Sequence, residues 1–182
     1  MLISDFVLDA MERNRRVTLS LVKGLSPEQL RWRAGPEANH IGFLLFHMFR
    51  AEDRYVHRWV SNTPEVWLSQ AWEPRFNLPL FPYDKDSPRS PGNGWTPQQV
   101  AAFEPLPMDD LLAYASAVRE STSLIIRHMD LGRLDEKPVS GRPDLTISRW
   151  LQYCITHEVE HQAQIGFIVG LMKTQFLRER VS

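Results

Sequence analysis

The sequence lacks several features that would point to particular classes of protein. It has one cysteine in 182 residues, Cys154, so no disulfide can form within the chain. No apolar run approaches the roughly 20 residues that a membrane-spanning helix needs, and the N-terminal segment lacks the apolar core of a signal peptide. We therefore expect a protein of the reducing cytoplasm that has no membrane as a partner.

An excess of charge of one sign is also missing. The formal net charge is −1, from 21 Lys and Arg against 22 Asp and Glu, and these residues are scattered along the chain. Proteins that bind nucleic acid need a concentrated basic surface. The composition therefore argues against nucleic acid as a partner, and we expect a small-molecule substrate instead.

Apolar residues recur at steps of three and four, whereas the alternation typical of strands is absent. Four long segments carry this helical pattern: 3–22, 39–60, 109–131 and 146–178. The sequences that begin at Ser26 and Thr96 have the form of helix caps and predict two short helices. We predict a single all-α domain over residues 1–182, folded as a four-helix bundle.

A long crossover, residues 62–108, joins the second and third of these helices. It contains nine of the thirteen prolines and three of the six tryptophans. Connections of this length are usually lids or disordered inserts, and the tryptophans favour an ordered lid. Trp67, Trp72 and Trp95 could line a pocket, but we expect them to form the core of the lid itself. So long a crossover also allows the third helix to run parallel to the second.

The strongest local signal is the pair His157 and His161, four residues apart in the last helix. This spacing projects both imidazoles from one face, and that face is the apolar one. Two buried neutral imidazoles each need a partner, and one divalent cation supplies a partner for both. The alternative is a pair of core histidines that are satisfied by hydrogen bonds.

A third candidate ligand, His47, lies on the apolar stripe of the second helix. Three protein ligands with an open position are typical of a catalytic metal site. His40 lies two turns away, about 10 Å along the axis, and cannot easily share the metal. His57 points away from the stripe and is expected at the surface, and His128 is expected to have a structural role near a helix C-terminus.

Three further residues lie near the predicted ligands. Glu158 is the candidate catalytic residue, because it could orient an imidazole or accept a proton, although it could also be solvated. Gln164, one turn beyond His161, is placed to contact an imidazole or a bound cofactor. Cys154 could be a thiolate ligand, but a small buried side chain is the interpretation that we prefer.

Two other metal sites are compatible with parts of the same pattern. Residues 157–161 have the form H-E-x-x-H of metalloproteases, but only 21 residues follow and none of them is a histidine. A di-iron bundle would need carboxylates such as Glu12 and Glu120. Both fall opposite the apolar stripes of their helices and are expected to face water, so this site is also disfavoured.

Two stretches resemble the DinB superfamily, which includes bacillithiol transferase and mycothiol-dependent maleylpyruvate isomerase. They are residues 39–55, which begin NHIGFLLFHM, and residues 157–165, HEVEHQAQI. The resemblance implies a four-helix bundle that holds a divalent metal, commonly zinc or nickel, and by position the ligands are His47, His157 and His161. The family often has Arg-Gly-Gln-Ile after the last histidine, where this chain has Gln-Ala-Gln-Ile, so the substrate side of the site differs.

The resemblance also implies a function. The expected activity is that of a transferase in which the metal activates a low-molecular-weight thiol for delivery to an electrophile. A metal-dependent hydrolase and a non-catalytic, metal-binding stress protein remain alternatives, because the same site can activate thiol or water. A homodimer formed through an outer helix face is a further expectation from the family.

Overall fold

The computed structural model describes residues 2–76, 91–138 and 144–179, and all regular structure in these ranges is helical. The all-α class is therefore confirmed. The long helices are α1 (Ile3–Val22), α3 (Ile41–Asp53), α7 (Met108–His128) and α8 (Ile147–Glu179). No helix in these ranges combines the length and the apolar character that a membrane crossing requires.

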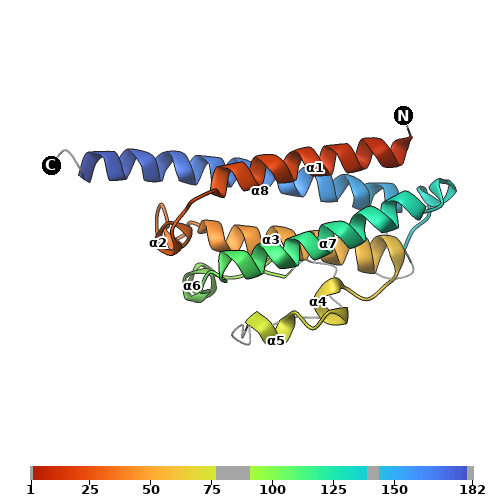
Figure 1. Cartoon of the computed structure of the whole chain (residues 1–182), viewed down its shortest axis with the longest axis horizontal. Coiled ribbons are helices and arrows are strands. Elements are labelled where there is room, and N and C mark those ends of the chain that lie inside the picture. Colours follow the sequence, from red (N-terminus) through yellow and green to blue (C-terminus); the bar gives the residue numbers. More distant parts are fainter. Residues whose placement is uncertain (1, 77–90, 139–143, 180–182) are drawn as a thin grey trace.

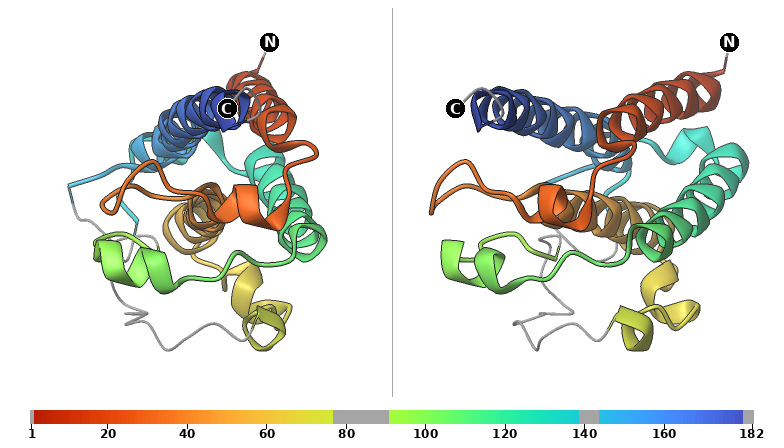
Figure 2. Two further views of the ribbon diagram at one scale, coloured as in Figure 1. Left: turned by 90° about the vertical axis from the view of Figure 1, so that its left-hand side faces the viewer. Right: turned by 60° about the vertical axis from the view of Figure 1, so that its left-hand side comes forward.

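The long helices form a closed set of neighbours. Helix α1 packs against α8 and α7, and α3 packs against the same two helices. Helices α1 and α8 run in one direction and α3 and α7 in the opposite one (Figure 1). The pair α1 and α8 lies above the pair α3 and α7 (Figure 2). Helices α3 and α7 are thus parallel, as the long crossover permits.

The predicted capping sequences begin two short helices, α2 (Pro27–Arg31) and α6 (Pro97–Ala102). In α2 the Ser26 hydroxyl accepts a hydrogen bond from the Gln29 N–H, and the Gln29 side chain accepts one from the Ser26 N–H. The same reciprocal pair begins α6 at Thr96. Such pairs satisfy N–H groups that have no partner inside the helix.

Beyond Asp53, helix α3 continues as a π-helix, η1 (Arg54–Ser61). A π-helix has wider turns than an α-helix, because its hydrogen bonds span five residues instead of four. Asn62 ends the run in the left-handed conformation, with φ of 55°. The directions of side chains in η1 therefore differ from those that α-helical spacing predicts.

The crossover carries two more short helices, α4 (Val66–Ser69) and α5 (Glu73–Phe76). Trp67 and Trp72 are buried and stack on Phe76, with ring centroids 5.4 and 5.9 Å apart. Both rings also contact Tyr114 of α7. Trp67 and Trp72 therefore belong to a hydrophobic core shared with α3 and α7, whereas the expectation was a core of the lid itself. Residues 77–90 of the predicted lid lie outside the described residues.

Candidate metal centre

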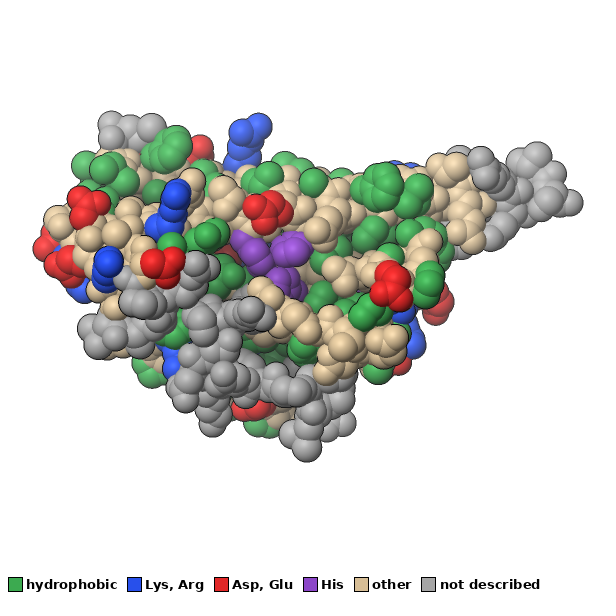
Figure 3. Space-filling view, turned by 180° about the vertical axis from the view of Figure 1, so that it is seen from behind, with side chains coloured by type: hydrophobic (Ala, Val, Ile, Leu, Met, Phe, Trp, Pro, Cys, Tyr) green, Lys and Arg blue, Asp and Glu red, His purple; other side chains and the backbone are tan. Residues whose placement is uncertain are grey.

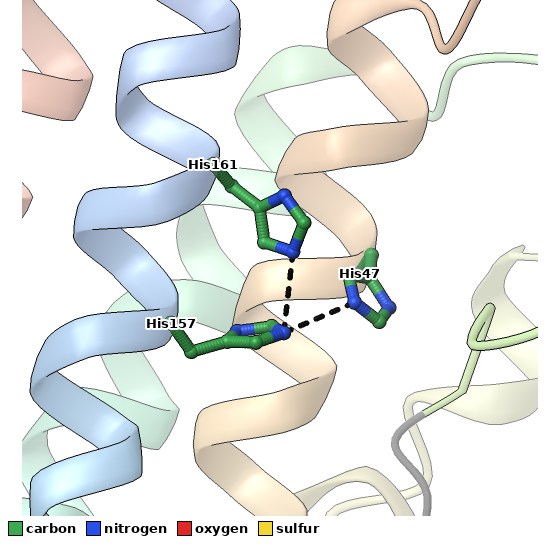
Figure 4. Close-up of side chains that lie close together, drawn as sticks. All are labelled: His47, His157 and His161. Atoms are coloured by element: carbon green, nitrogen blue, oxygen red, sulfur yellow. Dashed lines mark hydrogen bonds between the residues drawn. The ribbon is translucent and has the colours of Figure 1, made fainter.

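Three imidazoles from two helices converge at one point. His47 comes from α3, and His157 and His161 come from successive turns of α8 (Figure 4). The Nε2 atom of His157 lies 3.1 Å from Nε2 of His47 and 3.2 Å from Nε2 of His161. In the described part of the chain this is the one group of histidine, cysteine and acidic side chains close enough together to hold a metal ion.

These nitrogen–nitrogen distances suit a first-row divalent metal. Zinc binds histidine nitrogen at about 2.0–2.1 Å, which places tetrahedral nitrogen ligands about 3.3 Å apart. Two of the three distances therefore match such a site closely, and all three ligand atoms lie within 4.8 Å of one another. His157 and His161 are half-buried and His47 is buried, and Figure 3 shows histidine side chains that reach the surface on the face opposite that of Figure 1. Three ligands and an exposed side together leave room for a further ligand.

In His47 and His161, an oxygen atom lies close to Nδ1, the ring nitrogen that points away from the other two imidazoles. The Nδ1 atom of His47 lies 2.6 Å from the carbonyl oxygen of Pro91, and Nδ1 of His161 lies 3.2 Å from Oε1 of Gln164. An oxygen acceptor at Nδ1 keeps the proton on that atom and leaves the Nε2 lone pair for a metal. Gln164 therefore contacts His161, while its part in binding a cofactor stays a prediction.

The protein holds the imidazoles in the neutral form that metal binding needs. Burial, reinforced by the neighbouring imidazoles, lowers the pKa of His157 to about 2. Burial likewise lowers the pKa of His47 to about 4, against the opposing effect of the Pro91 carbonyl. The pKa of His161 is also lowered, mainly by burial. No proton has to leave these nitrogens near neutral pH before a cation can bind.

Packing around His47 requires a glycine in the crossover. Gly92 has φ of +90°, and a β-carbon at this position would lie 3.0 Å from the Phe43 ring and 3.2 Å from Nδ1 of His47. The Phe43 ring in turn stacks on the His47 imidazole, with centroids 5.9 Å apart. Only glycine allows the Pro91 carbonyl and the Phe43 ring to hold His47 from both sides.

The structure does not bring Glu158 to the imidazoles. Its buried carboxylate accepts hydrogen bonds from Arg15, Thr18 and Arg119, on the side of α8 that faces α1 and α7. Cys154 is buried with a free thiol, and burial raises its pKa, so the small buried side chain is the role that the structure supports.

The expectation that His57 lies at the surface is wrong. Its side chain is 3% exposed, with Nδ1 lying 3.0 Å from Oδ1 of Asp53 and Nε2 lying 2.7 Å from the Ser121 hydroxyl. Burial alone would lower the pKa of His57, but the Asp53 carboxylate raises it above the ordinary value. The error arose because a side chain off the apolar stripe was expected to face water, whereas α3 and η1 are buried on nearly every side and Ser121 of α7 covers His57.

The other histidines and acidic residues lie where they cannot join the site. His40 is buried as the N-cap of α3, where its Nδ1 accepts a hydrogen bond from the Phe43 N–H and its Nε2 lies 3.1 Å from the Val100 carbonyl. His128 is exposed, as are Glu12 and Glu120. The water-facing positions expected for both glutamates are confirmed, so they provide no di-iron ligands.

Two parts of the site's surroundings had no signal in the sequence. The acceptor at His47 is a backbone carbonyl of an irregular segment, so no side-chain pattern marks it. The partners of Glu158 come from α1 and α7, and their approach depends on how the helices pack. Only the turn at Gly92, with its positive φ, could have been expected from the sequence, since Pro-Gly is a common turn pair.

Comparison with known proteins bears on the fold and on the family. No match was found among curated proteins. A crystal structure described as that of a conserved protein of Enterococcus faecalis has a similar fold, with a TM-score of 0.78 and 17% identity over 93% of this chain and 96% of that chain. The family model of the DinB superfamily matches residues 10–165. The chain therefore belongs to the DinB superfamily.

Proposed function

We propose that the protein is a metal-dependent transferase that activates a low-molecular-weight thiol. In this proposal α1, α3, α7 and α8 act as a four-helix bundle that holds zinc or nickel through His47, His157 and His161. The observation that supports it most is the convergence of three neutral Nε2 atoms at distances of 3.1 and 3.2 Å.

The residues around the site suit an anionic fourth ligand. All three protein ligands are neutral, so they leave the charge of a divalent cation uncompensated. When bound, such a cation would lower the pKa of a thiol or water at its open position and make the nucleophile available at neutral pH. The chain's part is to orient the imidazoles, through the Pro91 carbonyl and the Gln164 side chain, and to keep them unprotonated.

The chain's own cysteine is unsuited to supply the thiol. Cys154 is 5% exposed and its raised pKa keeps it protonated. It also lies outside the group of side chains that could hold a metal. A reacting thiol would therefore come from solution, through the exposed side of the centre that Figure 3 shows.

The first experiment is elemental analysis of protein purified without a histidine tag. About one zinc or nickel per chain is expected, with loss of most of that metal in His47→Ala and His161→Ala. His128→Ala removes an exposed histidine as the control. If the substitutions at His47 and His161 leave metal content unchanged, the proposed site is wrong.

The second experiment separates thiol transfer from hydrolysis. The metal-loaded protein is incubated with a small thiol and an electrophile, such as an activated aromatic halide, and both thioether and hydrolysis product are measured. Thioether formation that is lost in His161→Ala supports the transferase. Hydrolysis without thioether would support the metal-dependent hydrolase, and neither product would support a non-catalytic, metal-binding role.

A further inference from the structure

Beside the metal centre, four charged side chains form a closed ring of ion pairs, with one residue from each long helix. The ion ring consists of Arg15 (α1), Glu52 (α3), Arg119 (α7) and Glu158 (α8). Arg15 lies 2.7 Å from Glu52 and 2.9 Å from Glu158. Arg119 lies 2.8 Å from Glu52 and 3.1 Å from Glu158. Each carboxylate is thus held by both arginines, and the ring has no net charge.

The ion ring is buried. The side chains of Arg15, Glu52 and Glu158 are 4–8% exposed, and that of Arg119 is 11% exposed. Burial would raise the pKa of Glu52, but Arg119 and Arg15 lower it to about 2. The Glu52 carboxylate is therefore ionised at neutral pH, so its ion pairs with both arginines persist under ordinary conditions.

The ring is attached to the turns that carry the metal ligands. Glu158 follows His157 directly and projects about 100° around α8 from it. Thr18 of α1 also donates a hydrogen bond to Glu158, at 3.2 Å. One turn later, the Gln162 side chain donates hydrogen bonds to the Asn14 carbonyl at 2.8 Å and to Thr18 at 3.2 Å. Both ligand-bearing turns of α8 are therefore fixed to α1.

The energetics of such a ring favour a role in geometry over a role in stability. The free energy needed to remove charges from water is about as large as the free energy gained from their attraction. Apolar residues of the same size therefore often stabilise a core just as much as a buried ion pair. The arginines fix the orientation of the glutamate side chains, because a planar guanidinium group binds carboxylates in a defined plane. Metal ligands need such direction, since a functional site must be held to within about 0.5 Å and 10–20°.

We propose that the ion ring is a positioning device for the metal centre. It fixes the rotation of α8 relative to α3, so that His157 and His161 face His47 before a cation arrives. The inference rests on the proposed metal site. Glu158 is then a positioning residue that acts through Arg15 and Arg119, and it has no need to exchange a proton with substrate.

Co(II) binding tests the proposal, since affinity and the visible absorption spectrum both report ligand geometry. In Glu158→Gln we expect Co(II) affinity to fall about 10–100-fold, the range for residues that orient metal ligands, and the visible bands to change. Glu160→Gln is the matched control, because it removes the same charge from the exposed neighbour of His161. Its effect should stay below about threefold, as is usual for an exposed charge.

A second control separates positioning from general loss of stability. Ile126→Ala opens a cavity in the core two turns beyond Arg119 on α7. It should lower the melting temperature at least as much as Glu158→Gln and leave the Co(II) spectrum unchanged. Glu52→Gln breaks the ring on α3 and should reproduce the spectral change. If Glu158 acted directly at the metal, Glu52→Gln would leave the spectrum unchanged, because Glu158 is still present.

The outcomes are distinct. Wild-type affinity and spectrum in both folded glutamine variants would overturn the positioning role while leaving the metal site intact. Absence of Co(II) binding by the wild type would refute the proposed site itself. If neither glutamine variant folds, Arg119→Lys is the deciding variant. It keeps the positive charge but loses the guanidinium group that contacts both carboxylates. An unaltered spectrum in Arg119→Lys would then overturn the proposal, and an altered one would support it.

Discussion

The Nδ1 atom of His47 lies 2.6 Å from the carbonyl oxygen of Pro91, so the crossover between α3 and α7 takes part in the candidate metal centre. This contact joins an irregular segment to a regular helix. It also makes the centre sensitive to substitutions in the crossover that leave all three histidines in place.

Gly92→Ala should weaken metal binding by about tenfold or more, the range for loss of a hydrogen bond to a ligand. The added β-carbon would lie within 3.2 Å of both His47 and Phe43, so the Pro91 carbonyl must move away. Metal affinity is measured by competition with a chromophoric chelator. Gly24→Ala is the control, because Gly24 also has a positive φ, of +76°, and a β-carbon there meets nothing within 4 Å. Equal losses in the two variants would show that backbone strain, and not the contact with His47, is responsible.

Metal removal should destabilise the wild type. A ligand that binds only the folded state contributes about 2.7 kcal/mol at 100 times its Kd, which for a chain of this size corresponds to about 5–10 °C in Tm. Thermal unfolding of the chelator-treated protein, with and without added zinc, measures the shift. His161→Ala should abolish it. A shift that persists in that variant would place the stabilising metal elsewhere.

The contribution of His57 to stability should depend on pH. Because Asp53 raises its pKa in the folded state, the ion pair contributes fully below the unfolded value of about 6.5 and is lost as pH rises through the folded pKa. The difference in unfolding free energy between wild type and His57→Gln should therefore shrink from pH 6 to pH 9. Denaturant titrations across this range measure it, with exposed His128→Gln as control. A difference that grows with pH would contradict the pairing with Asp53.

Cys154→Ala should leave metal content and any transferase activity within about twofold of wild type, because the thiol lies outside the group that could hold a metal. A modest loss of stability, of about 1–2 kcal/mol, is expected from the cavity. A thiol reagent should label native Cys154 far more slowly than the unfolded chain, since the side chain is buried. Loss of metal in Cys154→Ala would restore the thiolate-ligand alternative.

The sequence was most informative where the helices are regular. His157 and His161 face inward because α8 keeps α-helical spacing, and the ends of α1 coincide with the predicted segment 3–22. The placement of His57 failed, since the pattern of one helix does not show that α7 packs against the side away from its apolar stripe. The ion ring escaped prediction for another reason: Arg15 and Glu52 are charged residues of the kind usually found in water, and only tertiary packing turns them inward.

The sequence separation of the ligands has a consequence for biosynthesis. His47 and His157 are 110 residues apart in the chain, so a growing polypeptide has only one of the three imidazoles until α8 is being translated. If this centre binds metal as proposed, a chain that ends before α8 has only one of its ligands. Metal loading would then follow the emergence of α8 from the ribosome.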